Sequence, residues 1–216
     1  MSADAVSATP SRGGVPALPP RRLRRRSWRE AGFAALDFET TGLDRRRDAI
    51  VSFGVVPVRR GRVVLGEAVH QLVFPEIPSS PASMKVHRIL PRDLEVAPSL
   101  EVARQLLRRA LEGRFLLTWY AEVEVSFLER IFGGRHRSWA HRTVDTRRLA
   151  IELEGQDPDV RESLSRAAER YGVPVAAPHD ALDDALVTAQ LFLVLASKLE
   201  ARGLGTTKRL LRLTRV

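Results

Sequence analysis

Residues 33–43 read Phe-Ala-Ala-Leu-Asp-Phe-Glu-Thr-Thr-Gly-Leu, an apolar run that leads into two acidic side chains and a polar turn. The run at 33–36 is continuous, which predicts a buried strand. Asp37 and Glu39 stand two positions apart, so a strand projects both carboxylates from the same face. Such a pair repels and loses hydration unless a cation compensates it. The stretch therefore indicates either a metal site or a strand that simply ends in solvent.

The segments that follow predict an antiparallel meander. Residues 50–58 and 62–73 are rich in β-branched side chains and flank the turn Arg60-Gly61, so we expect a hairpin that continues the sheet. Beyond it we expect a fourth strand at 114–118. Hydrophobic periodicity predicts helices over residues 100–111, 121–132, 144–153, 162–171 and 180–199. This order predicts an α/β domain over residues 31–200, with helices flanking a mixed central sheet whose first three strands are antiparallel.

Composition narrows the chemistry. The chain has 216 residues and no cysteine, so a metal would be held by carboxylates, imidazole or water, which favours magnesium or manganese. No run of about 18 apolar residues occurs, which predicts no membrane span. The basic cluster after residue 20 is not followed by the apolar stretch of a secretory signal. We therefore expect a cytoplasmic protein.

The net charge of +9 is concentrated at the two ends of the chain. Residues 1–30 carry seven arginines against two acids, a net charge of +5. Residues 198–216 carry six basic side chains against one acid, again +5, which leaves −1 for the rest of the chain. We expect residues 1–30 and 201–216 to be basic tails, the first of them disordered. Such tails either attract nucleic acid or are only solvated.

Two predicted helices place acidic side chains on their apolar faces. In the helix over 180–199, Asp184 shares the apolar stripe, whereas Asp183 falls on the polar side. His179 precedes this helix, where an imidazole can accept a proton near neutral pH. In the helix over 121–132, Glu124 aligns with apolar positions and Glu122 does not. Glu124 and Asp184 thus join the first pair as candidate metal ligands.

Several of these residues lie in motifs that resemble those of a known protein family. The stretch 37–43 resembles the first motif of the DEDDh (DnaQ-like) 3′–5′ exonucleases, which include the epsilon proofreading subunit, ribonuclease T and oligoribonuclease. Residues 179–185 resemble the third motif, in which a His precedes the last metal-binding Asp by five positions. Residues 85–89 resemble the His-Gly-Ile element, with Arg88 in place of Gly, and residues 144–146 resemble a recurring Asp-Thr pair. The resemblance spans residues 33–199 and implies a ribonuclease H-like fold.

The second motif departs from the family pattern of His-Asn-Ala, two residues, then Asp. Here residues 119–124 read Trp-Tyr-Ala-Glu-Val-Glu, so Glu124 falls on the position of the usual Asp. The extra methylene changes the reach of the carboxylate, with consequences for metal preference or activity. Trp119 and Tyr120 would either stack on bases or pack, and packing is favoured.

The resemblance implies hydrolysis of DNA or RNA from a free 3′ end, single-stranded by expectation, with two Mg²⁺ or Mn²⁺ ions and release of nucleoside monophosphates. It implies that the ions are bound by Asp37, Glu39, Glu124 and Asp184 and that His179 accepts the proton of the water. It also implies that the terminal nucleotide is held by Thr40, Thr41, Leu43 and His87. Two alternatives stay open: a non-catalytic or weakly active nucleic-acid-binding member of the fold, and a proofreading subunit that binds a polymerase or other replication or repair protein through a tail at 206–216.

Overall fold

The computed structural model describes residues 14–157 and 161–214, and the expectations for the rest of the two tails lie outside these residues. Within these residues a six-stranded sheet runs in the order β3-β2-β1-β5-β6, and β4 also pairs with β2. The strands are β1 (Gly32–Thr40), β2 (Ile50–Arg59), β3 (Arg62–Val63), β4 (Val69–Leu72), β5 (Phe115–Thr118) and β6 (Thr143–Asp145). β1 is antiparallel to β2 and parallel to β5, so the expected mixed sheet is confirmed.

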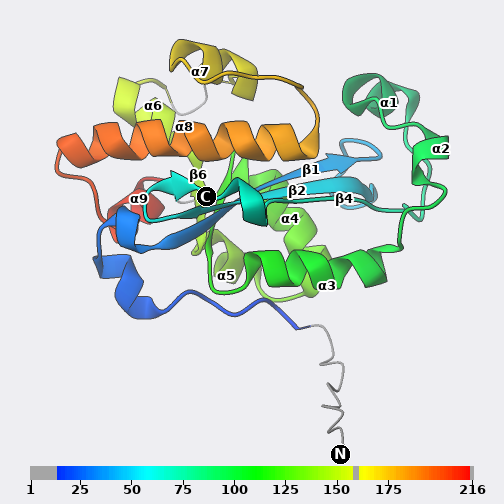
Figure 1. Ribbon diagram of the computed structural model, residues 1–216, viewed down its shortest axis with the longest axis horizontal. Coiled ribbons are helices and arrows are strands. Elements are labelled where there is room, and N and C mark those ends of the chain that lie inside the picture. The colour runs from blue at the N-terminus through cyan, green and yellow to red at the C-terminus, as the bar shows by residue number, and fades with distance from the viewer. Residues whose placement is uncertain (1–13, 158–160, 215–216) are drawn as a thin grey trace, which may run out of the picture.

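Helices cover both faces of the sheet (Figure 1). They are α1 (Pro81–His87), α2 (Pro91–Leu94), α3 (Leu100–Leu111), α4 (Ala121–Phe132), α5 (His136–Ala140), α6 (Thr146–Glu154), α7 (Leu164–Arg170), α8 (Ala181–Ala201) and α9 (Thr207–Leu213). The described part of the chain also contains the short 3-10 turns η1 (Arg21–Arg25), η2 (Trp28–Glu30) and η3 (Leu65–Glu67). Among the described residues, no helix is both long and apolar enough to cross a membrane.

β1 is buried on both faces, which explains its uninterrupted apolar run. Phe33 and Ala35 belong to the core that α8 closes, whereas Ala34 and Leu36 belong to the core beneath α3 and α4. Alternation along the strand therefore turns Asp37 and Glu39 toward the α8 side. The two acids continue a buried strand, so their positions are set by the packing of both cores.

The predicted single strand over 62–73 is wrong. The 3-10 turn η3 divides it into β3 and β4, and these pair with different parts of β2. Gly66 is a weak strand former at the centre of this turn. Glu67 lies in this turn, outside the β-sheet, and forms ion pairs with Arg59 and Arg114. Local side-chain interactions thus outweigh the β-branched composition of the segment.

The structure contains several short helices and a strand that the sequence patterns do not predict. Residues 143–145 form β6, and the helix predicted from residue 144 begins only at Thr146, because Asp145 caps it by accepting a hydrogen bond from the Arg148 amide at 3.0 Å. α1, α2 and α5 have four to seven residues. Elements this short contain too few turns for hydrophobic periodicity to reveal them.

The structure also corrects the expectation of two tails. Trp28 is 1% exposed and packs edge-on against Phe192, with ring centroids 5.6 Å apart. α9 buries Leu210 and Leu211 in the same core. The expected tails at 1–30 and 201–216 are therefore wrong over residues 21–30 and 204–214, because apolar side chains between the basic ones face inward. For its described part, the segment 206–216 is not a free partner-binding tail.

A glycine in β2 fixes how closely α8 approaches the sheet. Gly54 lies opposite Asp37 in the antiparallel pair of β1 and β2. A Cβ atom at Gly54 would lie 2.0 Å from the carbonyl oxygen of Ala181, the first residue of α8. The missing side chain therefore lets the N-terminus of α8 contact the sheet directly, beside the acidic end of β1.

Substituting Gly54→Ala is expected to lower the free energy of unfolding by about 1 to 3 kcal/mol, because the added methyl group must displace the backbone of α8. Urea unfolding measures the change. Gly66→Ala is the matched control, since no atom lies within 4 Å of its Cβ position. Equal stability of the two variants would contradict the close approach of α8.

Candidate active site

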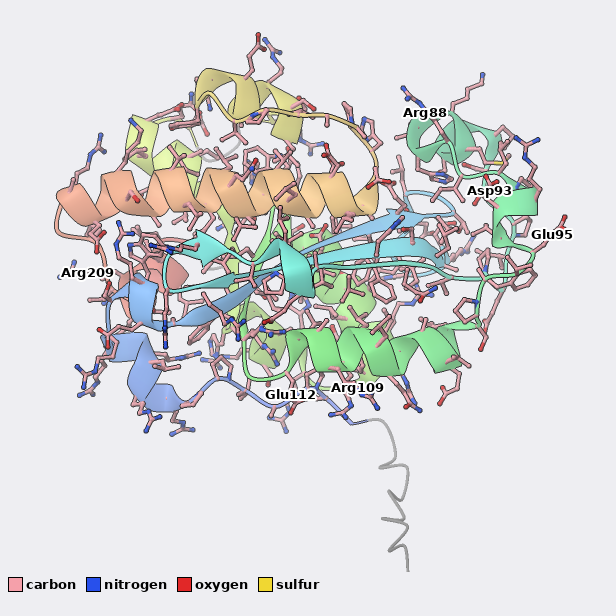
Figure 2. All side chains as sticks on the ribbon, in the orientation of Figure 1. Arg88, Asp93, Glu95, Arg109, Glu112 and Arg209 are labelled. Carbon is pink, nitrogen blue, oxygen red and sulfur yellow. The ribbon has the colours of Figure 1, made fainter. Side chains whose placement is uncertain are left out.

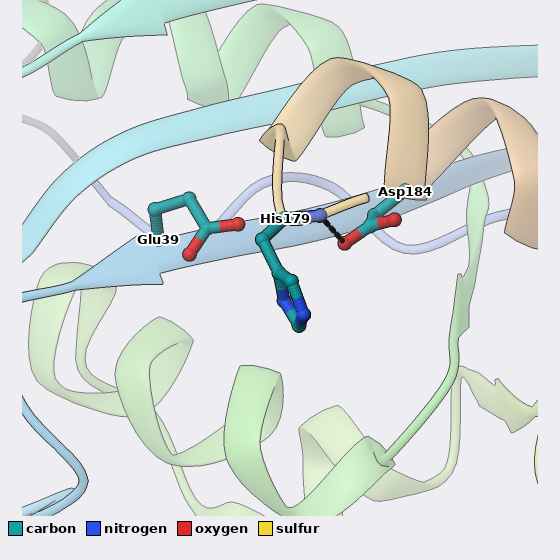
Figure 3. A group of neighbouring side chains, drawn as sticks. All are labelled: Glu39, His179 and Asp184. Carbon is teal, nitrogen blue, oxygen red and sulfur yellow. Dashed lines mark hydrogen bonds between the residues drawn. The ribbon is translucent and has the colours of Figure 1, made fainter. Parts of the chain in front are cut away.

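Three potential metal ligands meet where β1 ends and α8 begins (Figure 3). Glu39, on β1, is 8% exposed. Asp184 lies in the first turn of α8, and His179 lies in the loop just before that helix. Each offers a ligand atom within 4.8 Å of the others. Residues that are 145 positions apart in the sequence therefore share one small site.

The loop that presents His179 is held by the acids of α8. The Asp184 carboxylate accepts a hydrogen bond from the His179 amide at 3.1 Å. Asp183 accepts from the amides of Ala176 and Ala177 at 3.2 and 2.9 Å, so it holds the loop and does not simply face solvent as expected. His179 adopts a left-handed backbone conformation, with φ of 64°. A non-glycine residue rarely does so, and such strain persists only where surrounding bonds impose it.

Glu124 approaches the same site from α4. Its side chain is 5% exposed, and its Oε2 atom is buried without a hydrogen-bond partner in the described part of the chain. Burial is the largest of the effects that raise the pKa of Asp37 well above its ordinary value. The negative charge of Glu124 is the next largest, and smaller contributions come from Glu39, Asp184 and Asp180. Asp37 is therefore at the centre of the acidic cluster. A buried carboxylate oxygen without a donor is costly, and a cation would satisfy it.

Burial makes all these carboxylates hard to ionise. It raises the pKa of Glu39 to about 8, with further increases from Asp184 and Asp180. It raises the pKa of Glu124 to about 8 and that of Asp184 to about 6, although the hydrogen bond from His179 opposes the second shift. Such a cluster is stable in its charged form only with a compensating cation. Because its donors are carboxylate oxygens, it fits a hard ion such as magnesium or manganese.

Two acids contribute in ways that the sequence did not reveal. Asp180 caps α8 by accepting hydrogen bonds from Leu182 and Asp183, and its charge raises the pKa of Asp37, Glu39 and Asp184. Asp145 accepts hydrogen bonds from the amides of Ala121 and Arg148, which fixes the first turns of α4 and α6. The cap pattern of Asp180 and the Asp-Thr pair at 145–146 were visible signals, but their link to the cluster depends on tertiary contacts.

The turn after β1 has one projecting side chain and two that stabilise the loop. Leu43 is 98% exposed. The Thr40 hydroxyl donates to the carbonyl of Gly42 at 2.7 Å, and the buried Thr41 hydroxyl donates to Asp48 at 2.9 Å. The structure therefore gives Thr41 a role in holding the loop, which differs from the substrate contact expected for its side chain.

His87 lies at the end of α1 and is 7% exposed. Its Nδ1 atom accepts a hydrogen bond from the Ile89 amide at 3.0 Å, and burial lowers its pKa. Nε2 therefore carries the proton, and it is buried without a hydrogen-bond partner among the described residues. The Ser80 amide donates to the Thr41 carbonyl at 2.8 Å, which ties α1 to the turn after β1. The predicted contact of His87 with substrate stays a prediction.

The aromatic pair before α4 packs, as the sequence favoured. Trp119 is 6% exposed, and its Nε1 atom donates to the carbonyl of Glu162 at 3.1 Å. The Tyr120 hydroxyl donates to the same carbonyl at 3.2 Å. The two side chains thus anchor the start of α4, which carries Glu124, to the segment before α7.

Comparison with known proteins identifies the class to which this fold and site belong. The family model described as Exonuclease matches residues 34–192. The solved structure of Exonuclease X in complex with 5′ overhanging duplex DNA superposes with a TM-score of 0.62 at 24% identity, over 84% of this chain and 99% of that one. This likeness confirms the ribonuclease H-like α/β fold.

Sequence relatives agree with that class. The DNA polymerase III subunit epsilon-like protein of Rhodobacter capsulatus is 33% identical over 177 residues, covering 81% of this chain and 25% of that protein. DNA polymerase III PolC-type of Thermotoga petrophila is 31% identical over 182 residues, covering 82% of this chain and 13% of that protein. The chain belongs to the exonuclease family, which confirms the DEDDh resemblance, and it spans a quarter or less of these relatives.

Without metal, the free energy of unfolding is expected to fall as pH rises from about 4.5 to about 8. Glu39 and Glu124 keep their protons in the folded chain up to a pKa of about 8, whereas their ordinary value is 4.5. The folded state therefore binds more protons than the unfolded state across this window, and stability is lost with rising pH. Urea unfolding in EDTA should show a decrease on the order of 2 to 4 kcal/mol.

The variant Glu124→Gln should flatten this decrease and stabilise the metal-free protein at pH 8, because it removes one buried charge. Glu122→Gln is the control, since Glu122 is exposed on the same helix and pairs with Arg45. Added Mn²⁺ should reverse the trend, because ionised carboxylates bind the ion. A stability in EDTA that does not change with pH would refute this account of the cluster.

Proposed function

We propose that this chain is a metal-dependent 3′–5′ exonuclease that hydrolyses phosphodiester bonds and releases nucleoside monophosphates. The observation that carries the proposal is the cluster of Glu39, Asp184 and His179, whose ligand atoms lie within 4.8 Å of one another. Asp37 and Glu124 add two further carboxylates, since Glu124, Glu39 and Asp184 all raise the pKa of Asp37. Membership of the exonuclease family supports the reaction class. The names of the relatives, which refer to polymerase III, favour DNA as the first substrate to test.

The residues that would hold the ions are Asp37, Glu39, Glu124 and Asp184. The unsatisfied Oε2 atom of Glu124 and the raised pKa of each carboxylate favour this assignment. When bound, a pair of divalent cations supplies Lewis-acid stabilisation of the charge that develops on the phosphate. The protein contributes a rigid frame, because β1, α4 and α8 each present their acid from regular structure.

His179 is the proposed general base. Its ring is exposed beside Glu39 and Asp184, so it can accept the proton of an attacking water and pass it to solvent. Hydrogen bonds from the backbone amides of this loop to the carboxylates of Asp183 and Asp184 hold the imidazole in this place. Because the side chain is not buried, it can adjust when substrate enters, as catalytic side chains often do.

The exposed turn after β1 is the proposed contact for the terminal nucleotide. Leu43 projects into solvent and offers an apolar surface on which a base can rest. Thr40 orders the turn, and Asp48 packs so closely that a Cβ atom at Gly42 would lie 2.4 Å from its carboxylate. The turn is therefore fixed before substrate binds, which lowers the entropy cost of binding.

Cleavage of a 5′-labelled single-stranded oligonucleotide should proceed stepwise from the 3′ end with Mn²⁺ or Mg²⁺ and stop in EDTA. Asp37→Asn and His179→Ala should each lower kcat/KM by about 100-fold or more. Glu122→Gln should remain within about threefold, because an exposed ion pair contributes little. Matched DNA and RNA substrates in one assay identify the preferred sugar.

Unchanged cleavage by both active-site variants would refute the proposal. Metal-independent binding of the oligonucleotide without cleavage would instead favour a non-catalytic member of the fold. Glu124→Asp and Glu124→Gln separate charge from length at the position that departs from the family pattern. The Asp variant should retain most of the activity and the Gln variant should lose it, since only the first keeps a carboxylate.

A further inference from the structure

The end of the molecule that lies opposite the acidic cluster is strongly basic. Three segments meet there: the N-terminal residues 21–30, the turn between β2 and β3, and α9. They gather because the Trp28 backbone amide donates to the Gly205 carbonyl at 3.1 Å and the Thr207 backbone amide donates to the Arg26 carbonyl at 3.1 Å. The basic end surface comprises Arg21, Arg22, Arg25, Arg26, Arg29, Arg59, Arg60, Arg62, Lys208, Arg209 and Arg212, all exposed.

The turn between β2 and β3 adjoins the N-terminal segment directly. A Cβ atom at Gly61 would lie 3.0 Å from the Arg29 guanidinium and 3.6 Å from the Trp28 ring. Between the turn and η2 lies a hollow of about 820 Å³, lined by Arg59, Arg60 and Arg62 with Glu30. The surface is therefore continuous across segments that are far apart in the sequence.

Most of these cations have no acidic partner in the part of the chain that the structure describes. Arg29 pairs with Glu200 and Arg59 pairs with Glu67. Over residues 14–157 and 161–214, the other nine members of the basic end surface form no ion pair. Mutual repulsion of so many cations opposes folding unless an anion compensates it, and a polyanion does so over the whole surface at once.

The distance between the basic end surface and the acidic cluster indicates what kind of partner could contact both. β1 begins at Gly32, beside the basic end, and its far end carries Glu39. At about 3.3 Å per residue, the two are on the order of 20 Å apart. Figure 2 shows Arg209 at one end of the molecule and Arg88, beyond the acidic end of β1, at the other. At 3.4 Å per nucleotide in helical form, about six nucleotides bridge the gap.

We propose that the basic end surface binds the phosphate backbone of the same nucleic acid whose 3′ end lies in the acidic site. The inference rests on the proposed function and extends it, because it makes affinity depend on substrate length. Arginine predominates in the surface, and its planar fork suits phosphate oxygens. The contacts are to the backbone, so binding is strong at low salt and does not depend on sequence.

The test compares a 30-nucleotide and a 4-nucleotide single strand of DNA, by fluorescence anisotropy in EDTA, which prevents cleavage. The variant Arg25→Gln/Lys208→Gln/Arg212→Gln removes three exposed charges from the basic end surface. The control Arg109→Gln/Arg137→Gln/Arg166→Gln removes three exposed charges from α3, α5 and α7. The first variant should weaken binding of the long strand by about 10-fold or more and reduce its salt slope by about 2.

Cleavage of the short strand should be unchanged in the first variant, since four nucleotides do not reach the basic end. The wild-type protein gives a second measurement without any substitution: affinity for the long strand should depend on salt more steeply than affinity for the short one. The inference is overturned if the two triple variants bind the long strand equally, or if the two wild-type salt slopes agree. Vesicles that contain phosphatidylserine test a membrane as the alternative anionic partner. The inference is likewise overturned if the first variant loses binding to these vesicles but not to the long strand.

These outcomes are distinct from failure of the proposed function. If the wild-type protein cleaves nothing but the first variant loses affinity for the long strand, the surface binds nucleic acid and the catalytic proposal is refuted. If the wild-type protein cleaves both strands and the triple variants do not differ, only the basic end surface is refuted.

Discussion

Repulsion among the carboxylates at the end of β1 is the constraint around which the rest of the structure is organised. Asp37, Glu39, Glu124 and Asp184 would each be more stable in water, and burial raises the pKa of every one of them. They remain together because two hydrophobic cores fix β1 from both faces and the helices that carry the other acids pack on those cores. Apolar packing thus compensates an unfavourable electrostatic arrangement that a bound cation would neutralise.

The elements around the cluster are arranged for close approach. Gly54 lets the first turn of α8 contact the sheet, and that turn brings Asp184 to the carboxylates of β1. The strained backbone of His179 is held by bonds to the same turn. A change in the packing of α8 would therefore move Asp184 and His179 together. The acidic cluster and the basic end surface lie near the two ends of β1, so one strand separates two surfaces of opposite charge.

Much of this architecture was predictable from local sequence. The apolar run of β1, the periodicity of α3, α4 and α8, and the inward positions of Glu124 and Asp184 follow from side-chain spacing alone. The short helices α1, α2 and α5 did not follow, because each has too few turns to show a periodicity. The division of the strand at 62–73 and the strand β6 did not follow either, because the ion pair of Glu67 with Arg114 and the pairing of β6 with β5 join residues distant in the sequence. The sequence also did not predict that residues 21–30 and 204–214 pack on the core. Their composition is dominated by basic residues, and only a few apolar side chains such as Trp28, Leu210 and Leu211 make the contacts.

By itself, the sequence determined which residues are able to do chemistry: the acids at 37, 39, 124 and 184 and the imidazole at 179 have the types and spacings that a carboxylate metal site requires. Only the tertiary structure decided where they lie, which neighbours shift their pKa, and that Asp180, Asp145 and Gly54 shape the site. It also joined two basic segments from opposite ends of the chain into one surface. Spacing along a helix or strand is a local property, whereas proximity across the fold depends on how all the elements pack together.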